Sequence, residues 1–492
     1  MNLPASFITR TSQLMGEEAC QALCAALEKE TPISIRMNKE KLDATPQAAQ
    51  SIPWSQSGYY LEDRPTFTFD PLFHAGCYYV QEASSMFVEQ AVRQYVTKPS
   101  VALDLCAAPG GKSTLIRSLL PEGSFLIANE VMRNRSHVLA ENLVKWGNPD
   151  VMVTSNDPSD FTSMESLFDL ILTDVPCSGE GMFRKDQVAV DEWSPENVQL
   201  CWERQRRILR DIWPCLKPGG LLIYSTCTFN REENEDNVAW IAEELGADIL
   251  PISIGANWHI TGNLIGKDFP VYRFLPHKTI GEGLFLAVLR KHGTADGQVG
   301  DFLLTVTSEK KKNTKSKGND KSRAEKVKGS DRQKGNTVVK PLTFPTEWIA
   351  SLNLNTDEFD FWTEDGLARA IRCKWHALYD VAKSRLNVLH AGIIFAEQKG
   401  KDWQPHHSLA MSSWLNDTFF PSIELSYDQA IAYLRKEAVT LDAETPKGYV
   451  LLTFQGKALG FAKNIGNRAN NLYPQEWRIR SGYLPETIKT VF

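Results

Sequence analysis

The feature that most constrains this chain is a regular alternation of apolar runs and helical patterns between residues 100 and 291. Short runs of Val, Ile, Leu and Phe are typical of buried strands, and apolar residues three and four positions apart are typical of helices. This order predicts an α/β fold with a parallel sheet. The predicted strands are 101–105, 124–129, 151–154, 168–173, 221–224 and a late hairpin strand at 285–289, and the predicted helices are 112–120, 133–146, 195–216 and 232–245.

Two cysteines follow two of these strands, each in its own loop. Cys177 lies in Asp-Val-Pro-Cys-Ser-Gly-Glu-Gly at 174–181, and Cys227 lies in Tyr-Ser-Thr-Cys-Thr at 224–228. A glycine-rich loop, Asp-Leu-Cys-Ala-Ala-Pro-Gly-Gly-Lys, follows the first strand at 104–112. Loops at the carboxyl ends of parallel strands converge on one crevice. We therefore expect both thiols beside one cofactor pocket, an arrangement that suits covalent attack on a pyrimidine base.

Three cofactor classes compete for the glycine-rich loop. A triphosphate-binding loop requires G-x-x-x-x-G-K-[ST]; Gly111, Lys112 and Ser113 match its end, but Cys106 stands where the first glycine is needed. The dinucleotide pattern G-x-G-x-x-G is absent from the loop. The third class is the methyl donor S-adenosylmethionine, which has no pyrophosphate and needs a polar pocket.

Acidic residues after three further strands favour the methyl donor. Glu130 ends the second strand, where a carboxylate accepts hydrogen bonds from both ribose hydroxyls in dinucleotide sites. Asp157 follows the third strand and is expected to reach the adenine edge, and Asp174 ends the fourth. Such a series repels a triphosphate and suits a sulfonium cation. For each acid taken singly, a helix cap or a solvated loop residue is the alternative.

Charge is unevenly distributed along the chain. The 492 residues suffice for roughly three domains, and their formal net charge of −6 ordinarily argues against a nucleic-acid partner. Residues 308–340, however, carry twelve basic and four acidic side chains, a net +8, which leaves −14 for the rest. This apolar-poor stretch is predicted to be a disordered linker, either a solvated tether or a contact for RNA phosphates.

The remaining composition predicts a cytoplasmic protein with no membrane partner and no metal. No apolar run reaches the roughly 18 residues needed to span a bilayer, and the first residues lack the basic and apolar regions of a signal peptide. The nine cysteines show no paired C-x-x-C spacing, which argues against a disulfide scaffold and against a structural zinc site.

These motifs together closely resemble the RNA 5-methylcytosine methyltransferase family. The match rests on residues 104–112, 174–181 and 224–227, with support from Ile-Arg-Met-Asn at 35–38 and Gln-Glu-Ala-Ser-Ser-Met at 81–86. The resemblance implies a Rossmann-like class I S-adenosylmethionine-dependent methyltransferase core with an N-terminal α+β extension. It also implies a C-terminal α/β region that ends in a small PUA-like β domain. The cofactor-binding residues are then expected to be Cys106, Ala107, Ala108, Pro109, Gly110, Gly111, Lys112, Glu130, Asp157 and Asp174.

The domain organisation follows from the same resemblance and from the composition. A β-hairpin is predicted at 448–462, and the basic and aromatic residues after it suit RNA binding. The expected domains are an N-terminal α+β RNA-binding extension at 1–95, a catalytic domain at 96–305, a basic linker at 306–340, a linking domain at 341–395 and a PUA-like RNA-binding domain at 396–492.

The resemblance also implies catalytic roles for four side chains. Cys227 is the implied nucleophile toward cytosine C6, and Cys177 is implied to assist product release. DNA cytosine methyltransferases attack from the Pro-Cys motif instead, so the residues alone offer two nucleophile candidates. Asp174 is expected to hydrogen-bond the cytosine N3–N4 edge. Lys112 is expected to bridge methyl donor and base and to help keep a thiolate ionised.

The implied substrate is 16S rRNA, at cytosine 1407, within the 30S subunit, and the protein is expected to be a monomer. Residues 179–184, the basic linker and the long C-terminal region resemble a bacterial branch of the family that acts on this RNA. The target base must leave its stack, and Arg36, Arg184 and Lys185 are candidates to position its phosphates. The alternatives are methylation of another RNA such as transfer RNA or of DNA, a triphosphate-binding enzyme, and a non-catalytic RNA-binding protein.

Overall fold

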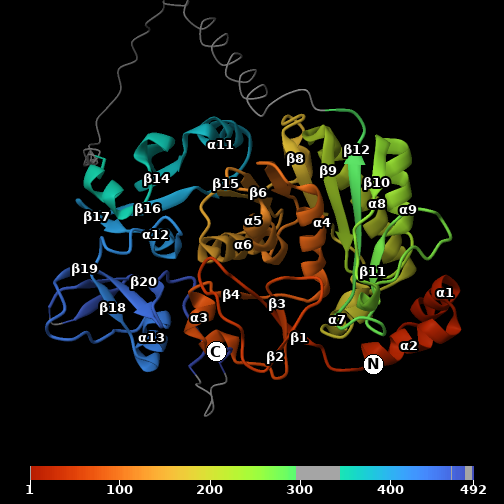
Figure 1. The fold of residues 1–492 in the computed structure, drawn as a ribbon, viewed down its shortest axis with the longest axis horizontal. Coiled ribbons are helices and arrows are strands. Elements are labelled where there is room, and N and C mark those ends of the chain that lie inside the picture. The colour runs from red at the N-terminus through yellow and green to blue at the C-terminus, as the bar shows by residue number, and fades with distance from the viewer. Residues whose placement is uncertain (1, 295–343, 467, 483–489) are drawn as a thin grey trace, which may run out of the picture.

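A nine-stranded sheet forms the centre of the computed structural model, which describes residues 2–294, 344–466, 468–482 and 490–492 (Figure 1). The strand order is β10-β12-β9-β8-β5-β6-β7-β15, with β11 paired to β12. Strands β5 to β9 pair in parallel, and β12 and β15 flank them in antiparallel orientation. The strands are β5 (Val101–Asp104), β6 (Phe125–Asn129), β7 (Val151–Thr154), β8 (Phe168–Asp174), β9 (Leu216–Thr226), β10 (Ala247–Leu250), β11 (Tyr272–Phe274), β12 (Leu284–Lys291) and β15 (Val388–Ala391).

Helices cover both faces of this sheet, because successive strand residues point into two separate apolar cores. On one face pack α4 (Val88–Tyr95), α5 (Gly111–Leu119) and α6 (Arg133–Trp146), and on the other α8 (Pro195–Ile212), α9 (Glu235–Trp240) and α11 (Cys373–Arg385). Ala102 and Leu126 belong to the first core, whereas Leu103 and Ile127 belong to the second. The predicted α/β fold class is therefore confirmed.

Local signals set the limits of these helices. Ser194 accepts the backbone N–H of Asn197 at 3.1 Å, and Pro195 occupies the first turn, so α8 begins where predicted. The helix predicted at 195–216 ends earlier, at Ile212, and continues as the 3₁₀ turn η5 (Trp213–Cys215). Helix α6 has the predicted limits and is followed by Gly147, whose φ of +98° places it in the left-handed region.

The N-terminal part forms two helices and a separate four-stranded sheet ordered β2-β3-β1-β4. Its elements are α1 (Ala5–Met15), α2 (Glu17–Leu27), β1 (Ile33–Met37), β2 (Ala49–Ser51), β3 (Gly58–Leu61), η1 (Phe67–Phe69), α3 (Pro71–His74) and β4 (Tyr78–Val80). The apolar spacing over 80–95 predicts one helix, which the structure confirms only over α4 (Val88–Tyr95). Residues 84–87 form the 3₁₀ turn η2 (Ser84–Phe87), capped by Glu82, whose carboxylate accepts the N–H groups of Ser84 and Ser85. These local bonds override the periodicity.

The C-terminal part adds two four-stranded sheets, β13-β14-β16-β17 and β18-β19-β20-β21. Their strands are β13 (Phe359–Glu364), β14 (Leu367–Arg372), β16 (Ile393–Lys399), β17 (Asp402–Pro405), β18 (Ser422–Glu424), β19 (Gly448–Phe454), β20 (Lys457–Asn464) and β21 (Ala469–Asn471), and the nearby helices are η8 (Thr346–Ser351), η9 (Thr356–Glu358), α12 (His407–Met411) and α13 (Tyr427–Leu434). The hairpin predicted at 448–462 is formed by β19 and β20. The domain limit predicted at residue 395 falls inside β16, so the first of these sheets spans both predicted C-terminal domains.

The C-terminal part is also built into the central sheet. Strand β15 extends that sheet beside β7, and Trp375 and Leu378 of α11 pack into one of its cores. In addition, β19, β20 and α13 share a separate apolar core with β1, α3 and β4 of the N-terminal part. The predicted basic linker at 306–340 lies outside the described residues. In the described part of the chain, no helix combines the length and apolarity needed to cross a membrane.

Candidate active site

A cleft of about 380 Å³ opens beyond the carboxyl ends of β5, β8 and β9. Strands β6 and β8 lie on opposite sides of β5, so the loops after these strands diverge there, as at the ligand sites of other open α/β sheets. The glycine-rich loop forms one wall, and the other walls come from β4 and the segment after it and from the start of β12. The cleft is lined by Tyr79, Val80, Gln81, Glu82, Ser85, Cys106, Ala107, Ala108, Pro109, Gly111, Lys112, Asp174, Gly181, Met182, Lys185, Cys227, Glu282, Gly283 and Leu284.

The glycine-rich loop is held between β5 and α5 in a defined conformation. Gly110 has a φ of +117°, which favours glycine, and directly precedes α5. A Cβ at Gly111 would lie 3.3 Å from the ring of Tyr79, so a larger residue would crowd the cleft wall. Asn142 of α6 donates its side-chain N–H to the carbonyl oxygen of Pro109 at 2.8 Å. The loop residues that line the cleft are Cys106, Ala107, Ala108, Pro109, Gly111 and Lys112, whereas Gly110 is not part of the lining.

The two predicted thiols meet at one end of the cleft. The Sγ atoms of Cys177 and Cys227 are 3.2 Å apart, within hydrogen-bond distance for sulfur. Their loops are joined by the N–H of Gly181, which donates to the carbonyl oxygen of Cys227 at 2.7 Å. The hydroxyls of Ser178 and Thr228, one residue beyond each cysteine, are 2.9 Å apart. The convergence predicted from the strand order thus brings the thiols into direct contact.

Lys112 and Asp174 form an ion pair beside the thiols. Lys112 Nζ lies 2.7 Å from Asp174 Oδ2, and Ser225 donates its hydroxyl to Asp174 Oδ1 at 2.8 Å. Burial lowers the pKa of Lys112, but the charges of Asp174, Asp104 and Cys227 and the hydrogen bond to Asp174 outweigh it, and the net pKa is raised. Lys112 therefore stays cationic at neutral pH, and Asp174 is held in one orientation.

The acids around the cleft fit a cationic cofactor. Asp104 is fully buried; its Oδ2 accepts the hydroxyl of Ser113 at 2.6 Å, and its Oδ1 has no hydrogen-bond partner among the described residues. Burial, reinforced by the charge of Asp174, raises the pKa of Asp104 to about 7. A positive charge nearby stabilises the ionised form of such a group, and a triphosphate opposes it. With Glu82 and Glu282 on the walls, this set of side chains fits a sulfonium compound such as S-adenosylmethionine.

Glu130 and Asp157 do not line this cleft within the described structure. The Glu130 carboxylate accepts the backbone N–H of Met132 at 2.9 Å and lies 3.5 Å from Arg135. Asp157 pairs with Arg207 at 3.0 Å, and hydrogen bonding to this guanidinium lowers the pKa of Asp157 to about 2. Their predicted contacts with ribose and adenine therefore stay predictions.

Two of the three cations proposed for RNA phosphates are buried, which corrects that prediction. Arg36 is 1% exposed and donates a hydrogen bond at 2.8 Å to the side chain of Gln81, which lines the cleft. The Arg184 side chain is 6% exposed and lies 3.3 Å from Glu282. Only Lys185 reaches the cleft surface. Charged side chains are usually exposed, but both of these arginines are internal hydrogen-bond donors.

Cys106 and Cys177 have raised pKa values. The hydrogen bond with Cys227, followed by burial, raises the pKa of Cys177 well above its ordinary value. Burial also raises the pKa of Cys106, followed by the charge of Asp104. Cys106 and Cys177 are therefore neutral thiols at pH 7, and Cys177 is suited to donate its S–H to Cys227.

Sequence reasoning missed most of the walls of the cleft. Gln81, Glu82 and Ser85 lie in the stretch 81–86, which supported the family resemblance. The sequence did not show that this stretch lines the cleft. Glu282 and Gly283 carry no such pattern, because only the long-range pairing of β12 with β9 brings them to the cleft. No three His, Cys, Asp or Glu side chains in the described ranges are arranged to hold a metal ion.

The sheet, the cofactor loop and the acidic cleft define a class I S-adenosylmethionine-dependent methyltransferase. A methyltransferase homologue of known structure from Pyrococcus horikoshii is 28% identical, with a TM-score of 0.51 over 58% of this chain and 94% of its own. NSun6 from the same organism, solved with SFG, shares the fold at a TM-score of 0.51 and 21% identity, over 59% of this chain and 99% of its own.

Family models narrow this class. The model of 16S rRNA methyltransferase RsmB/F matches residues 96–290, that of the RsmF N-terminal domain matches 3–83, and that of the RsmF PUA domain matches 420–479. Ribosomal RNA small subunit methyltransferase F of Escherichia coli is 31% identical, and that of Cronobacter sakazakii 29%; both alignments cover 98% of this chain and 97% of the relative. The chain belongs to the ribosomal RNA small subunit methyltransferase F family. It is an rRNA methyltransferase whose cofactor is S-adenosylmethionine.

Proposed function

We propose that this enzyme methylates C5 of a cytosine in 16S rRNA, at position 1407, through a covalent bond between Cys227 and C6 of the base. The observation that carries the proposal is the 3.2 Å contact of Cys227 with Cys177, beside the Lys112–Asp174 pair. Cys227, Lys112 and Asp174 line one cleft. Cytosine C5 is a weak nucleophile, and a thiolate added to C6 activates it. Covalent catalysis thereby divides one difficult step into easier ones.

Cys227 begins the reaction by forming a C6–S bond, and the electron pair of the C5–C6 double bond becomes available at C5. S-adenosylmethionine, when bound, would supply an electrophilic methyl group to that electron pair and would leave as S-adenosylhomocysteine. Transfer of the C5 proton to solvent then re-forms the C5–C6 double bond and expels the Cys227 thiolate. The enzyme thus regains its nucleophile at the end of each turnover.

Two features support Cys227, rather than Cys177, as the nucleophile. The charge of Cys227 is among those that raise the pKa of Lys112, so this cation lies close enough to stabilise a Cys227 thiolate. The raised pKa of Cys177 keeps that thiol protonated, so it can donate a hydrogen bond to Cys227. Cys177 is then placed to assist departure of Cys227 from the methylated base.

Asp174 and Lys112 orient the base and the charge around it. Each carboxylate oxygen of Asp174 accepts one internal hydrogen bond, from Ser225 or from Lys112, and retains a further lone pair. The Asp174 side chain is 33% exposed, so it can accept the cytosine N4–H and hold a proton on N3. An N3-protonated ring accepts thiolate attack more readily, and Lys112 stays cationic throughout.

The cofactor contacts and the RNA contacts belong to the same proposal. Cys106 to Lys112 hold the methyl donor, and Glu130 and Asp157 contact its ribose and adenine. The N-terminal extension and the PUA-like domain bind the RNA around the target, and a monomer acts on rRNA within the 30S subunit. The matches of the RsmF N-terminal and PUA domain models support the assignment of RNA binding to these two parts of the chain.

The two-thiol scheme is tested by trapping the covalent adduct. Each variant is incubated with 16S rRNA and S-adenosylmethionine and examined on a denaturing gel. Cys227→Ala is expected to abolish turnover and give no adduct, whereas Cys177→Ala is expected to accumulate one. An adduct with Cys227→Ala and none with Cys177→Ala would reverse the two roles. RNA binding with no methylation by the unmodified protein would favour the binding-protein alternative.

A further inference from the structure

Two buried carboxylates connect the thiol loops to each other. Glu180, three residues beyond Cys177, accepts the backbone N–H groups of Phe229 and Asn230 at 2.6 and 3.0 Å. These donors belong to the loop that follows Cys227. A residue of the first thiol loop therefore anchors the backbone of the second.

The reverse connection is made by Glu233 with the help of Gln205. Glu233 Oε2 accepts the N–H of Ser178 at 3.1 Å and the side-chain N–H of Gln205 at 2.7 Å. Gln205 also donates to the carbonyl oxygen of Pro176 at 3.0 Å. Pro176 and Ser178 are the two neighbours of Cys177. Both sides of this cysteine are thus held by one pair of side chains from α8 and from the loop after Cys227.

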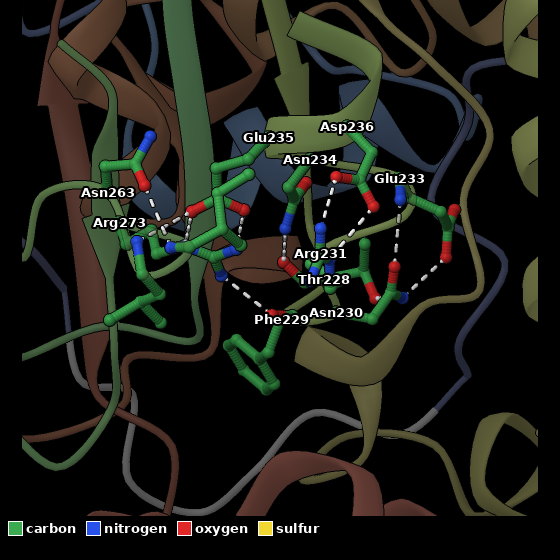
Figure 2. Close-up of polar contacts among 12 residues, drawn as sticks. Thr228, Phe229, Asn230, Arg231, Glu233, Asn234, Glu235, Asp236, Asn263 and Arg273 are labelled. Atoms are coloured by element: carbon green, nitrogen blue, oxygen red, sulfur yellow. Dashed lines mark hydrogen bonds and ion pairs between the residues drawn. The ribbon is translucent and has the colours of Figure 1, made fainter. Parts of the chain in front are cut away.

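Asn230 joins the two carboxylates. Its side-chain N–H group donates to Glu233 Oε1 at 2.8 Å and to Glu180 Oε1 at 3.1 Å. Its Oδ1 accepts the backbone N–H of Glu233 at 3.0 Å, and Figure 2 shows Asn230 and Glu233 facing each other across these contacts. Glu180, Glu233 and Asn230 are 1%, 0% and 8% exposed. The three form one buried network between the thiol loops.

Stability alone does not explain this network. In the described part of the chain, neither Glu180 nor Glu233 has an ion-pair partner, although burying a carboxylate without a cation is unfavourable. Nearby, Glu235 has a buried cation, Arg273, which also bonds the carbonyl oxygen of Phe229 (Figure 2). Local rules of this kind are broken mainly where function requires it.

We propose that Glu180, Glu233 and Asn230 form a reciprocal clamp that sets the relative position of the two thiols, with Glu233 the positioning residue for Cys177 and Glu180 the positioning residue for Cys227. This inference rests on the proposed covalent mechanism and assigns each carboxylate to one of its steps. Glu180 acts on adduct formation by Cys227, and Glu233 acts on product release through Cys177.

The charge of the clamp agrees with these roles. Burial raises the pKa of Glu233 to about 7, and the neighbouring Glu180 contributes to the rise. The other titratable groups that face Glu233 are Cys177, Cys201 and Tyr224, whose pKa values are raised mainly by burial or, for Cys177, by its bond to Cys227. The Glu233 charge adds to the rise at Cys177 and so helps to keep that thiol protonated.

Glu233→Gln separates the two steps of the reaction. Both Glu233 oxygens accept hydrogen bonds. The NH2 group of a glutamine at this position would therefore face the NH2 group of either Asn230 or Gln205, and that hydrogen bond would be lost. We expect release to slow by about tenfold or more, because small displacements of reacting groups have effects of this size. Adduct formation is expected to keep its rate, so the adduct accumulates as in Cys177→Ala. Glu180→Gln is expected to slow adduct formation instead and to accumulate nothing.

The experiment measures both rates for each variant. Reactions with 16S rRNA and S-adenosylmethionine are quenched in detergent, the adduct is quantified on a denaturing gel, and 5-methylcytidine is quantified after digestion. Glu232→Gln is the matched control, because this neighbour pairs with Arg10 at the surface, and it is expected to match the unmodified enzyme. Gln205→Met removes the hydrogen bonds to Pro176 and to Glu233 while both carboxylates stay in place, and it is expected to accumulate adduct.

Each outcome decides between positioning and a merely structural role. Equal loss of both steps in Glu233→Gln and Gln205→Met, or no effect on either step, would overturn the clamp. If thermal unfolding shows that Glu233→Gln does not fold, Gln205→Met decides the question. Failure of the proposed function has a different signature, which overturns both ideas: the unmodified enzyme makes no 5-methylcytidine and Cys177→Ala traps no adduct.

Discussion

Gly181→Ala is expected to slow methyl transfer because Gly181 packs against the backbone of Cys227. A Cβ at position 181 would lie 2.5 Å from the carbonyl oxygen of Cys227 and 3.2 Å from that of Glu282. Ordinary contact begins at 3.4 Å, so these atoms must separate by about 0.9 Å, and a displacement near 1 Å costs on the order of 100-fold in rate. Gly181 does not have a positive φ, so backbone strain adds nothing to the effect.

The assay is single-turnover methyl transfer from labelled S-adenosylmethionine to 16S rRNA with enzyme in excess. Gly262→Ala is the control, because no atom lies within 4 Å of the added Cβ, and its rate is expected to be unchanged. Overpacking at Gly181 lowers the free energy of unfolding by about 1 to 3 kcal/mol, which urea unfolding measures separately. A Gly181→Ala rate equal to that of the unmodified enzyme, or an equal loss in Gly262→Ala, would refute the placement of the Cys227 loop.

Three further predictions concern charge. Lys112→Met removes the cation beside Asp174 and Cys227 and is expected to slow methyl transfer by on the order of 100-fold; Lys112→Arg should recover part of the rate. Arg273→Met leaves Glu235 buried without its cation and is expected to lower the free energy of unfolding, measured in urea, by about 3 to 5 kcal/mol; an unchanged midpoint contradicts the ion pair. The pKa of Glu233 is raised from 4.5 to about 7, so the native state retains its proton longer than the unfolded state. Relative to Glu233→Gln, the unmodified protein should therefore be most stable below pH 4.5 and lose about 3 kcal/mol as the pH rises through 7; a pH-independent difference refutes the shift.

The catalytic core was predictable because its signals are local. Apolar periodicity located β5 to β8 and α6 within a residue or two, and glycine and proline marked the loops between them. Loops at the carboxyl ends of parallel strands meet at one edge of the sheet, so Cys177 and Cys227 were expected beside one pocket. The 3.2 Å contact between their Sγ atoms is a finding of the structure.

The remaining features depend on contacts between distant residues. Strand β15 belongs to the catalytic sheet only because it pairs with β7, more than two hundred residues earlier. From the sequence, Arg36 was a candidate to bind a phosphate. In the structure it is buried and donates hydrogen bonds to Gln81 and Thr114. The Glu180–Asn230–Glu233 network was not predicted either. Glu180 belongs to a motif of the resemblance that assigns it no contact, and Glu233 falls in the helix predicted at 232–245, whereas α9 begins at Glu235.

The most direct test of the account is methyl transfer to defined nucleic acids. The purified protein is incubated with labelled S-adenosylmethionine and, separately, with 16S rRNA, 30S subunits, transfer RNA and DNA, and the products are digested to nucleosides. The proposed function predicts label in 5-methylcytidine from 16S rRNA or 30S subunits and none from transfer RNA or DNA. Label in another nucleoside, or in no nucleic acid, would contradict it.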